Sequence, residues 1–491
     1  MNLAEIRREL TEFKSKTARR RHEIYGGLPE TSSFEEIRET GSEIFSQSAI
    51  ELLKGLTDNP AGQSSKEIAA RHKLTGIILF GFLSRKTAEI DSQIERARRK
   101  VSIKINGELL NGPQIRQRIL AEEEKDARRQ IDELALEASS VFSDLIFEKL
   151  GVLKSQSQKF ANRSISEMFE SSSNIRSSEF QARAAKFLEI TEEIYMKMFS
   201  DRFRSTNCLT HSDFQYYLEN RDRRSPFLGK HLKYFYVQIL ESFGFSERKV
   251  PQIKFMLENP EKISEKFAIR IPEEIFFHCS AKDGTAGYLD FFRIFGESQQ
   301  NAWTSRNLIE KYPEFVFSTD NVLANGFGVL FQTLLIDELF LKKILLIEDQ
   351  NLLNSVLGQN KFRFLYEIRR EIIKSGLENS LYFEESADLD KLFNDSARSF
   401  SNALNVEFRS VQLIHDISFE NAAQKRVRGF LFGVGLREYL RQRHGFDWWK
   451  KRTAFMELID LWNTAETHSA EEMASLIGFE MSFEQLAISA F

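Results

Sequence analysis

The sequence contains few cysteines, prolines and glycines. Its two cysteines, Cys208 and Cys279, cannot form a disulfide framework in a chain of 491 residues, which favours a reducing compartment. Only 8 Pro and 24 Gly provide few turn signals, so long helices are favoured over many short strands. A strong basic charge is also absent, because 68 Lys and Arg stand against 72 Asp and Glu. The formal net charge of −4 gives no reason to expect a nucleic-acid partner.

Long apolar runs are lacking as well. Residues 1–21 are charged throughout and have no apolar segment typical of a signal peptide. The longest apolar run near the front, 77–83, is far shorter than the roughly 20 residues that a membrane span needs. A second candidate, 326–341, is also too short and contains Asp337 and Glu338. We therefore expect a soluble, cytoplasmic protein without a membrane partner.

The remaining composition is that of a folded globular protein. Hydrophobic residues make up 42% and charged residues 29% of the chain, and 44 Phe predict an aromatic-rich core. Composition and periodicity divide the chain into three regions, 1–204, 205–345 and 346–491. The first and third have helical periodicity, and the first is interrupted by a β-hairpin near 101–110, where Asn106-Gly107 is a strong turn signal. The middle region has the strands and apolar helices of a catalytic core.

Several elements are predicted within these regions. A long amphipathic helix is expected from about 113 to 150. Two segments, 249–256 and 267–279, have strand-like composition, and Pro272 places the second near a sheet edge or at a strand start. The segments 287–303 and 321–345 have the composition of two apolar helices.

Common catalytic motifs are absent from the sequence. There is no P-loop and no G-x-S-x-G motif, and Gly433-Val434-Gly435 lies in a helical run where it cannot serve as a dinucleotide fingerprint. None of the 8 histidines has a second one at the helical spacing of metal ligands. His22 is followed by Glu23 but not by the rest of an H-E-x-x-H motif, and we expect it on a solvated helix face.

One stretch, 271–303, resembles the active-site region of zinc metallopeptidases of the oligoendopeptidase F and thimet oligopeptidase type. In that family an edge strand and a short Asp/Gly loop precede a helix with the motif H-E-x-G-H. The similarity continues at 312–315 and 320–332, where the family's next helix supplies a third zinc ligand from a Glu, and at 436–449 in the closing helices. The resemblance implies a mainly α metallopeptidase-like fold with a small β-sheet beside a central cleft.

The resemblance also implies that the zinc site is lost. Arg293 occupies the position of the first His ligand, Ile294 that of the general-base Glu, and Gly296 keeps the motif glycine. The second His ligand becomes Glu297, and the third-ligand Glu becomes Asn325. Arginine stays protonated and cannot ligate zinc, and isoleucine cannot take a proton from water. We therefore expect no metal, no cofactor and no retained catalytic residue.

Arg293 and Glu297 are four residues apart on one helix, so they can form an ion pair. Our hypothesis is that this pair, joined by Asn325, fills the space of the missing zinc.

Other residues are candidates for lining the cleft. They are His278, expected as a partly exposed residue of the edge strand, Gly296, and His415, Tyr439 and His444, which are of the residue types that the family uses as oxyanion donors in its C-terminal helices. Trp448-Trp449 is interpreted as helix packing rather than a partner surface, and both cysteines as buried thiols.

Three functions remain open. The favoured one is a catalytically inactive pseudopeptidase that still binds a peptide or protein segment in its cleft by strand addition, because main-chain hydrogen bonds need no zinc. The alternative is an active peptide hydrolase with a non-standard metal site, for which the available side chains are His278, Glu297, Glu314 and Asp320. A third is a scaffold whose cleft has closed over a Phe-rich core formed by Phe291, Phe292 and Phe295.

Overall fold

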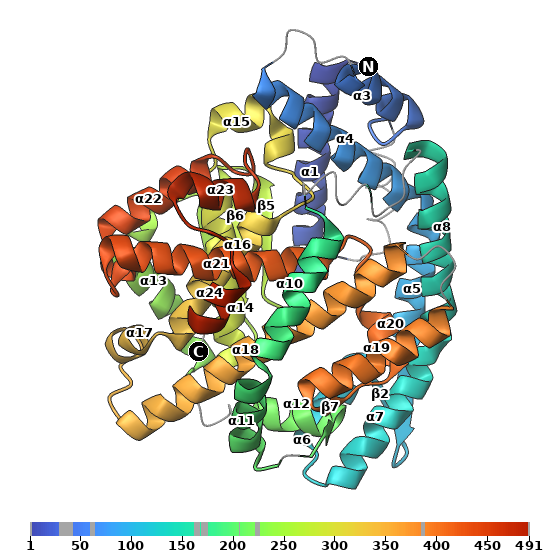
Figure 1. Cartoon of the computed structure of the whole chain (residues 1–491), viewed down its shortest axis with the longest axis vertical. Coiled ribbons are helices and arrows are strands. Elements are labelled where there is room, and N and C mark those ends of the chain that lie inside the picture. The colour runs from blue at the N-terminus through green and yellow to red at the C-terminus, as the bar shows by residue number, and fades with distance from the viewer. Residues whose placement is uncertain are drawn as a thin grey trace. The chain divides into compact units, whose positions relative to one another are not determined.

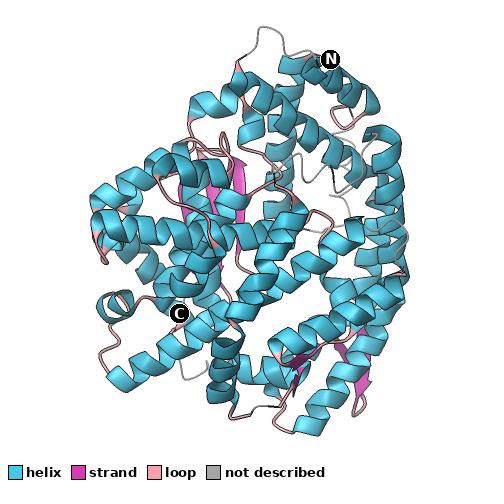
Figure 2. Ribbon diagram, viewed as in Figure 1, coloured by secondary structure: helices cyan, strands magenta, loops and turns pink. Residues whose placement is uncertain are grey.

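The computed structural model describes residues 2–28, 43–58, 64–161, 167, 175–205, 207–220, 226–383 and 388–489. Helices dominate, with small sheets between them (Figures 1 and 2). The chain forms two compact units that are discontinuous in sequence. The first comprises Met1–Phe82, Ser225–Asn360 and Arg428–Phe491, and the second Leu83–Arg224 and Lys361–Val427. The three consecutive regions predicted from the sequence follow composition along the chain, and as domains they stay a prediction.

Three long helices run across the boundaries between these units, namely α4 (Ser65–Lys86), α18 (Gln350–Phe383) and α21 (Ala422–His444). The other helices of the first unit are α1 (Leu3–Tyr25), α3 (Gln47–Asp58), α13 (Leu232–Ser242), α14 (Thr285–Trp303), α15 (Arg306–Lys311), α16 (Val322–Gln332), α17 (Glu338–Lys343), α22 (Arg452–Asn463), α23 (Ala470–Ile477) and α24 (Phe483–Ser489). No helix among the described residues is long and apolar enough to cross a membrane.

The sheet of the first unit has three strands, β4 (Ile253–Glu258), β5 (Glu265–Arg270) and β6 (Glu274–Ser280). Their order is β4-β6-β5, with β6 parallel to β4 and antiparallel to β5. The segment 267–279, predicted as one strand, is therefore most of a hairpin with Pro272 in its turn. Alternation along β6 sends Phe277 toward α14 and Phe276 toward α1, so each face of the sheet is covered by a helix.

The two apolar helices of the middle region are only partly as predicted. The segment 287–303 is confirmed as α14, whereas 321–345 is broken into α16, a 3₁₀ turn (Thr333–Ile336) and α17. The break lies at Asp337, whose carboxylate accepts a hydrogen bond of 2.9 Å from the backbone N–H of Phe340 and so caps α17. Because Asp337 caps the start of a new helix, the chain does not continue as the single helix that its apolar composition predicted.

The second unit is almost entirely helical. Its further helices are α5 (Ala88–Lys100), α6 (Gly112–Ala121), α7 (Lys125–Ser139), α8 (Ser143–Ala161), α10 (Ser177–Ile190), α11 (Glu192–Phe203), α12 (His211–Asn220), α19 (Leu389–Leu404) and α20 (Ser410–Asp416). The predicted hairpin is confirmed as β1 (Ser102–Ile105) and β2 (Glu108–Asn111), with positive φ at Asn106 and Gly107. A short parallel pair joins β3 (Leu209–Thr210) to β7 (Val406–Glu407). The single helix predicted over 113–150 is wrong, because α6 ends at Ala121 and α7 at Ser139.

Candidate functional site

The residues singled out by the resemblance lie where α14 crosses α16. At Gly296 an added Cβ would lie 2.3 Å from the carbonyl oxygen of Phe327, and at Gly328 it would lie 3.1 Å from the carbonyl oxygen of Arg293. The two helix backbones therefore touch, and each glycine makes room for the other helix. Gly296 is a packing residue buried between helices rather than a residue that lines an open cleft, which corrects its expected place.

Arg293 and Glu297 form the predicted ion pair. Arg293 Nη1 lies 3.1 Å from Glu297 Oε1, and Arg293 Nη2 lies 3.6 Å from Asp290 Oδ1. Burial acts to lower the pKa of the Arg293 guanidinium, but the Glu297 and Asp290 carboxylates outweigh it and leave that pKa raised. The guanidinium is therefore a fixed positive charge on this helix.

A second cation reaches the same carboxylate from the sheet. Lys266 of β5 places its Nζ 3.7 Å from Glu297 Oε2 and donates a hydrogen bond of 3.4 Å to the backbone carbonyl of Glu297. Burial lowers the pKa of the Lys266 amine, and Glu297 opposes that shift. Glu297, whose side chain is only 14% exposed, thus lies between two cations. The sequence analysis missed Lys266 because strand β5 and helix α14 meet only in the fold.

The other two positions given by the resemblance, Ile294 and Asn325, have no described contact with the ion pair. Ile294 is 1% exposed and belongs to the apolar core. Asn325 is half-buried on α16, where an added Cβ at Gly429 of α21 would lie 2.8 Å from Asn325 Cβ. The described contacts of Arg293 and Glu297 are with each other, with Asp290 and with Lys266, and the expectation that Asn325 joins their ion pair stays a prediction.

His278 has a different environment from the predicted one. It lies on β6, the central strand, and is 4% exposed, so it is neither at the sheet edge nor partly exposed. Its Nδ1 is 2.7 Å from Glu258 Oε1 on the neighbouring strand β4, and its Nε2 is 3.0 Å from Nε2 of His22.

His22 lies on α1 against the sheet rather than on a solvated face. Its ring stacks on Phe276 at a centroid distance of 4.0 Å. Burial, followed by the neighbouring His278, lowers the pKa of His22. The two histidines are 256 residues apart in sequence, and no local pattern indicates that they meet.

The structure brings Tyr439 and His444 together at one carboxylate. The Tyr439 hydroxyl donates a hydrogen bond of 2.5 Å to Glu457, and His444 Nε2 lies 2.7 Å from the same carboxylate. Burial and this carboxylate raise the pKa of Tyr439. Glu457 belongs to α22, so the cluster ties α21 to α22, and its described hydrogen bonds include none to Arg293 or Glu297.

His415 belongs to the second unit. Its ring stacks on Phe142 at a centroid distance of 4.2 Å. Burial and the Arg98 guanidinium lower the pKa of His415 to about 4, so this imidazole is neutral near pH 7. A neutral, stacked histidine is typical of a packed core position.

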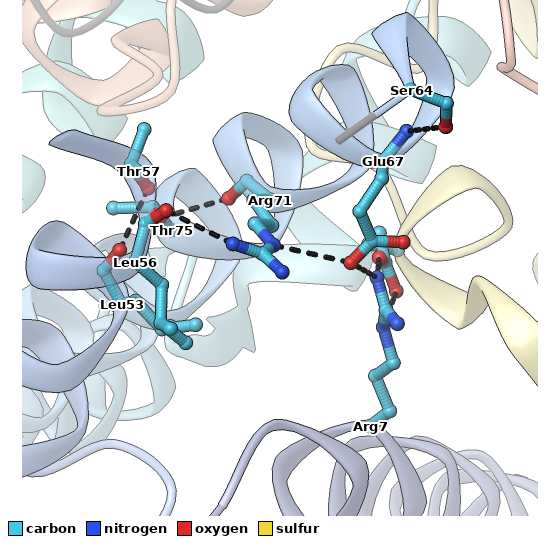
Figure 3. A network of polar contacts seen from close by, with 9 residues as sticks. Arg7, Leu53, Leu56, Thr57, Ser64, Glu67, Arg71 and Thr75 are labelled. Atoms are coloured by element: carbon cyan, nitrogen blue, oxygen red, sulfur yellow. Dashed lines mark hydrogen bonds and ion pairs between the residues drawn. The ribbon is translucent and has the colours of Figure 1, made fainter. Parts of the chain in front are cut away.

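The side chains considered for a non-standard metal site have separate partners. Glu314 accepts hydrogen bonds of 2.5 to 3.2 Å from Arg7, which also lies 3.3 Å from Glu67 in the network that ties α1 to α4 (Figure 3). Asp320 pairs with the buried Arg428 at 2.7 Å. In the part of the chain that the structure describes, no group of three or more His, Cys, Asp or Glu side chains is placed to hold a metal ion.

Three packing predictions are confirmed and one is wrong. Trp448 and Trp449 are buried, as are the aromatic side chains Phe291, Phe292 and Phe295 of α14. Cys279 is buried, and burial raises the pKa of its thiol to about 12. Cys208 is exposed, contrary to prediction.

A pocket of about 910 Å³ opens in the first unit between α1, the end of β5 and α15. Its lining includes the apolar residues Leu3, Ile269, Ile309 and Phe317. The sequence analysis did not find this pocket, because it is formed by three segments, 3–16, 268–273 and 306–317, that are far apart in the sequence.

Comparison with known proteins supports the fold. No protein-family model matches the sequence, and no curated protein matches it. Solved structures do resemble it, each at 10% sequence identity. An M32 carboxypeptidase from Deinococcus radiodurans R1 has a TM-score of 0.60, with 99% of this chain and 96% of that chain covered. A carboxypeptidase from Pyrococcus furiosus has a TM-score of 0.59 (100% of this chain and 98% of that chain), and metallocarboxypeptidase 1 from Trypanosoma cruzi has a TM-score of 0.60 (98% of this chain and 98% of that chain).

These likenesses extend over essentially the whole of each chain. The protein therefore has the helical metallopeptidase fold of the M32 carboxypeptidases, and the predicted fold class is confirmed. The neighbours are carboxypeptidases, so the narrower resemblance to oligoendopeptidase F stays a prediction.

The fold implies a metal, and the residues at the position given by the resemblance do not fit one. A catalytic zinc needs three neutral or anionic donors and an open position for water. Here the carboxylate of Glu297 is engaged by Arg293 and Lys266, and Ile294 is buried in the core. No chemical step through a metal can be derived from these side chains.

Proposed function

We propose that this protein is a metallopeptidase-like chain that has lost its catalytic metal centre and binds peptides without cleaving them. The observation that carries the proposal is the ion pair of Arg293 and Glu297, in the α14 positions where the resemblance expects two histidine ligands. A guanidinium in contact with the carboxylate occupies space that a cation would need and repels it.

The residue that the resemblance puts at the position of the general base supports the same proposal. Peptide hydrolysis at a zinc centre requires a group that takes a proton from the attacking water. Ile294 is in the position of that base, and an alkyl side chain has no proton acceptor. A chain that regained a metal would therefore still lack this step.

The experiment is hydrolysis of a mixed peptide library by protein purified without chelator, with and without added zinc, followed by mass spectrometry. We expect no new cleavage products under either condition. Cleavage that a chelator abolishes would contradict the proposal and would favour an active hydrolase with a different metal site. In that case, the cleavage activity of a His278→Ala variant purified in the same way shows whether that histidine belongs to the metal site.

A further inference from the structure

The pocket beside α1 is elongated and has apolar residues on each of its walls. Its α1 wall runs from Leu3 to Lys16 and so extends roughly 20 Å at 1.5 Å per residue, the length of an extended acyl chain of about 16 carbons. The other walls contribute Ile269 from the end of β5, Ile309 of α15, and Phe317. The volume of about 910 Å³ is that of a small-molecule site.

Part of the charge in the lining is neutralised within the protein. Three of its cations have carboxylate partners, namely Arg7, Arg270 and Arg306. Five charged residues of the lining are exposed and form no ion pair with any described residue, three cations (Arg8, Lys16 and Lys311) and two carboxylates (Glu12 and Glu310). Three positive and two negative charges leave +1, although the net charge of the protein is −4. A single excess charge suits a monoanion and is too small for a polyanion such as a nucleic acid.

Two of the unpaired cations belong to the same end of the pocket. The Arg7 guanidinium lies over the ring of Tyr312, 4.9 Å from its centroid, and so joins the first turns of α1 to the end of α15. Arg8 follows Arg7 in the chain, Lys311 precedes Tyr312, and both line the pocket. This end therefore has one cation from each helix, and a single carboxylate can interact with both.

We propose that this pocket binds the anion of a long-chain fatty acid, with the carboxylate at Arg8 and Lys311 and the acyl chain along α1 toward Ile269. The apolar side chains remove methylene groups from water, which provides most of the affinity. The two cations select a carboxylate over an amine. The elongated shape favours an acyl chain over a compact ring system. Such a small-molecule site does not depend on whether the protein also binds peptides.

The test measures displacement of a fluorescent fatty acid, dansylaminoundecanoic acid, from the full chain. The competitors are tetradecanoate, octanoate and tetradecylammonium, each used below the concentration at which it forms micelles. We expect tetradecanoate to displace the probe. Octanoate should compete at least about a hundredfold more weakly, because each buried methylene changes the affinity about fourfold. Tetradecylammonium has the same chain with a cationic head and should compete at least about tenfold more weakly.

Charge-reversed variants locate the carboxylate. Arg8→Glu on α1 and Lys311→Glu on α15 should each weaken the binding of tetradecanoate about fivefold, the effect of one exposed ion pair. Lys249 is an exposed lysine of the same unit that does not line the pocket, so Lys249→Glu should leave binding unchanged. None of these three cations forms an ion pair with a described residue, so the substitutions break no described ion pair.

A second pair of variants locates the acyl chain. Ile309→Gln replaces a half-buried apolar side chain of the lining and should weaken the binding of tetradecanoate about tenfold. Leu476→Gln is the matched control, because Leu476 of α23 is exposed and does not line the pocket. Circular dichroism shows whether both variants are folded before binding is measured.

Several results would overturn the inference. They are equal competition by tetradecanoate and tetradecylammonium, no dependence on chain length, or insensitivity to Arg8→Glu, Lys311→Glu and Ile309→Gln. Sedimentation of the protein with phosphatidylglycerol vesicles, without displacement of the probe by monomeric tetradecanoate, would assign these cations to a lipid surface instead. The outcome is independent of the proposed function, because neither metal nor peptide cleavage enters the measurement.

Discussion

Glu297 is the residue on which the site depends. One carboxylate neutralises Arg293 from its own helix and Lys266 from strand β5. The pairing with Arg293 could be predicted, since a spacing of four residues places both side chains on one helix face. The contribution of Lys266 could not, because it depends on how the hairpin of β5 and β6 packs on α14.

This arrangement predicts unequal effects of removing the two partners of the ion pair. Glu297→Gln removes the carboxylate between Arg293 and Lys266 and leaves Arg293 with only the more distant Asp290, so it should lower the free energy of unfolding by about 1–3 kcal/mol. Arg293→Gln leaves Glu297 paired with Lys266 and should cost about 1 kcal/mol or less. Urea denaturation of both variants measures the difference, and equal losses would show that the carboxylate is not shared.

A second prediction concerns Gly296. Gly296→Ala places a methyl group 2.3 Å from a backbone carbonyl of α16, which cannot move aside as a side chain can. We expect a loss of stability of about 2–3 kcal/mol. Gly151→Ala is the matched control, because this exposed glycine of α8 has nothing within 4 Å of an added Cβ and should gain up to about 1 kcal/mol. Similar midpoints of thermal unfolding for Gly296→Ala and the parent would contradict the close crossing.

At the scale of elements, helix α1 is fixed at both ends. Arg7 ties its first half to Glu314 and Glu67, and His22 ties its last turn to His278. The helical periodicity of the region 1–204 predicted a helix here, and Ile6 and Leu10 form the buried face of α1. The partners of the helix could not be predicted, because all of them are distant in sequence. The pocket beside α1 therefore also required the structure.

The lowered pKa of His22 predicts a pH dependence of this docking. The unfolded chain binds a proton at His22 below its ordinary pKa of about 6.5, whereas the folded chain resists it, so stability is lost as the pH falls through that range and is complete above it. The charged groups that act on His22 are Glu23, Glu274 and Lys254, and Glu258 lies on the far side of His278.

His22→Gln removes this dependence while keeping a polar side chain. We expect the variant to unfold at a lower temperature than the parent at about pH 8 and the gap to narrow toward about pH 5. Thermal melts at several pH values measure it. A difference in melting temperature that stays constant over that range would mean that the pKa of His22 is the same in the folded and the unfolded chain.

At the scale of the whole molecule, the class of fold could be predicted and the grouping of its parts could not. Few prolines and glycines together with helical periodicity indicated a mainly helical chain, and the stretch around 271–303 indicated a metallopeptidase-like fold. The structural neighbours confirm that class of fold. Three boundaries between the two units fall inside the helices α4, α18 and α21. Because composition does not change at these points, the sequence did not predict the boundaries.

The central claim is that this metallopeptidase fold no longer holds a catalytic metal. The most direct measurement is the zinc content per chain, by inductively coupled plasma mass spectrometry, of protein purified without chelator and dialysed against zinc-free buffer. The quadruple variant Arg293→His, Ile294→Glu, Glu297→His, Asn325→Glu, checked for folding by circular dichroism, serves as the comparison with a restored ligand set. We predict that the parent protein retains far less than one equivalent of zinc. One equivalent bound by the parent protein would contradict the account.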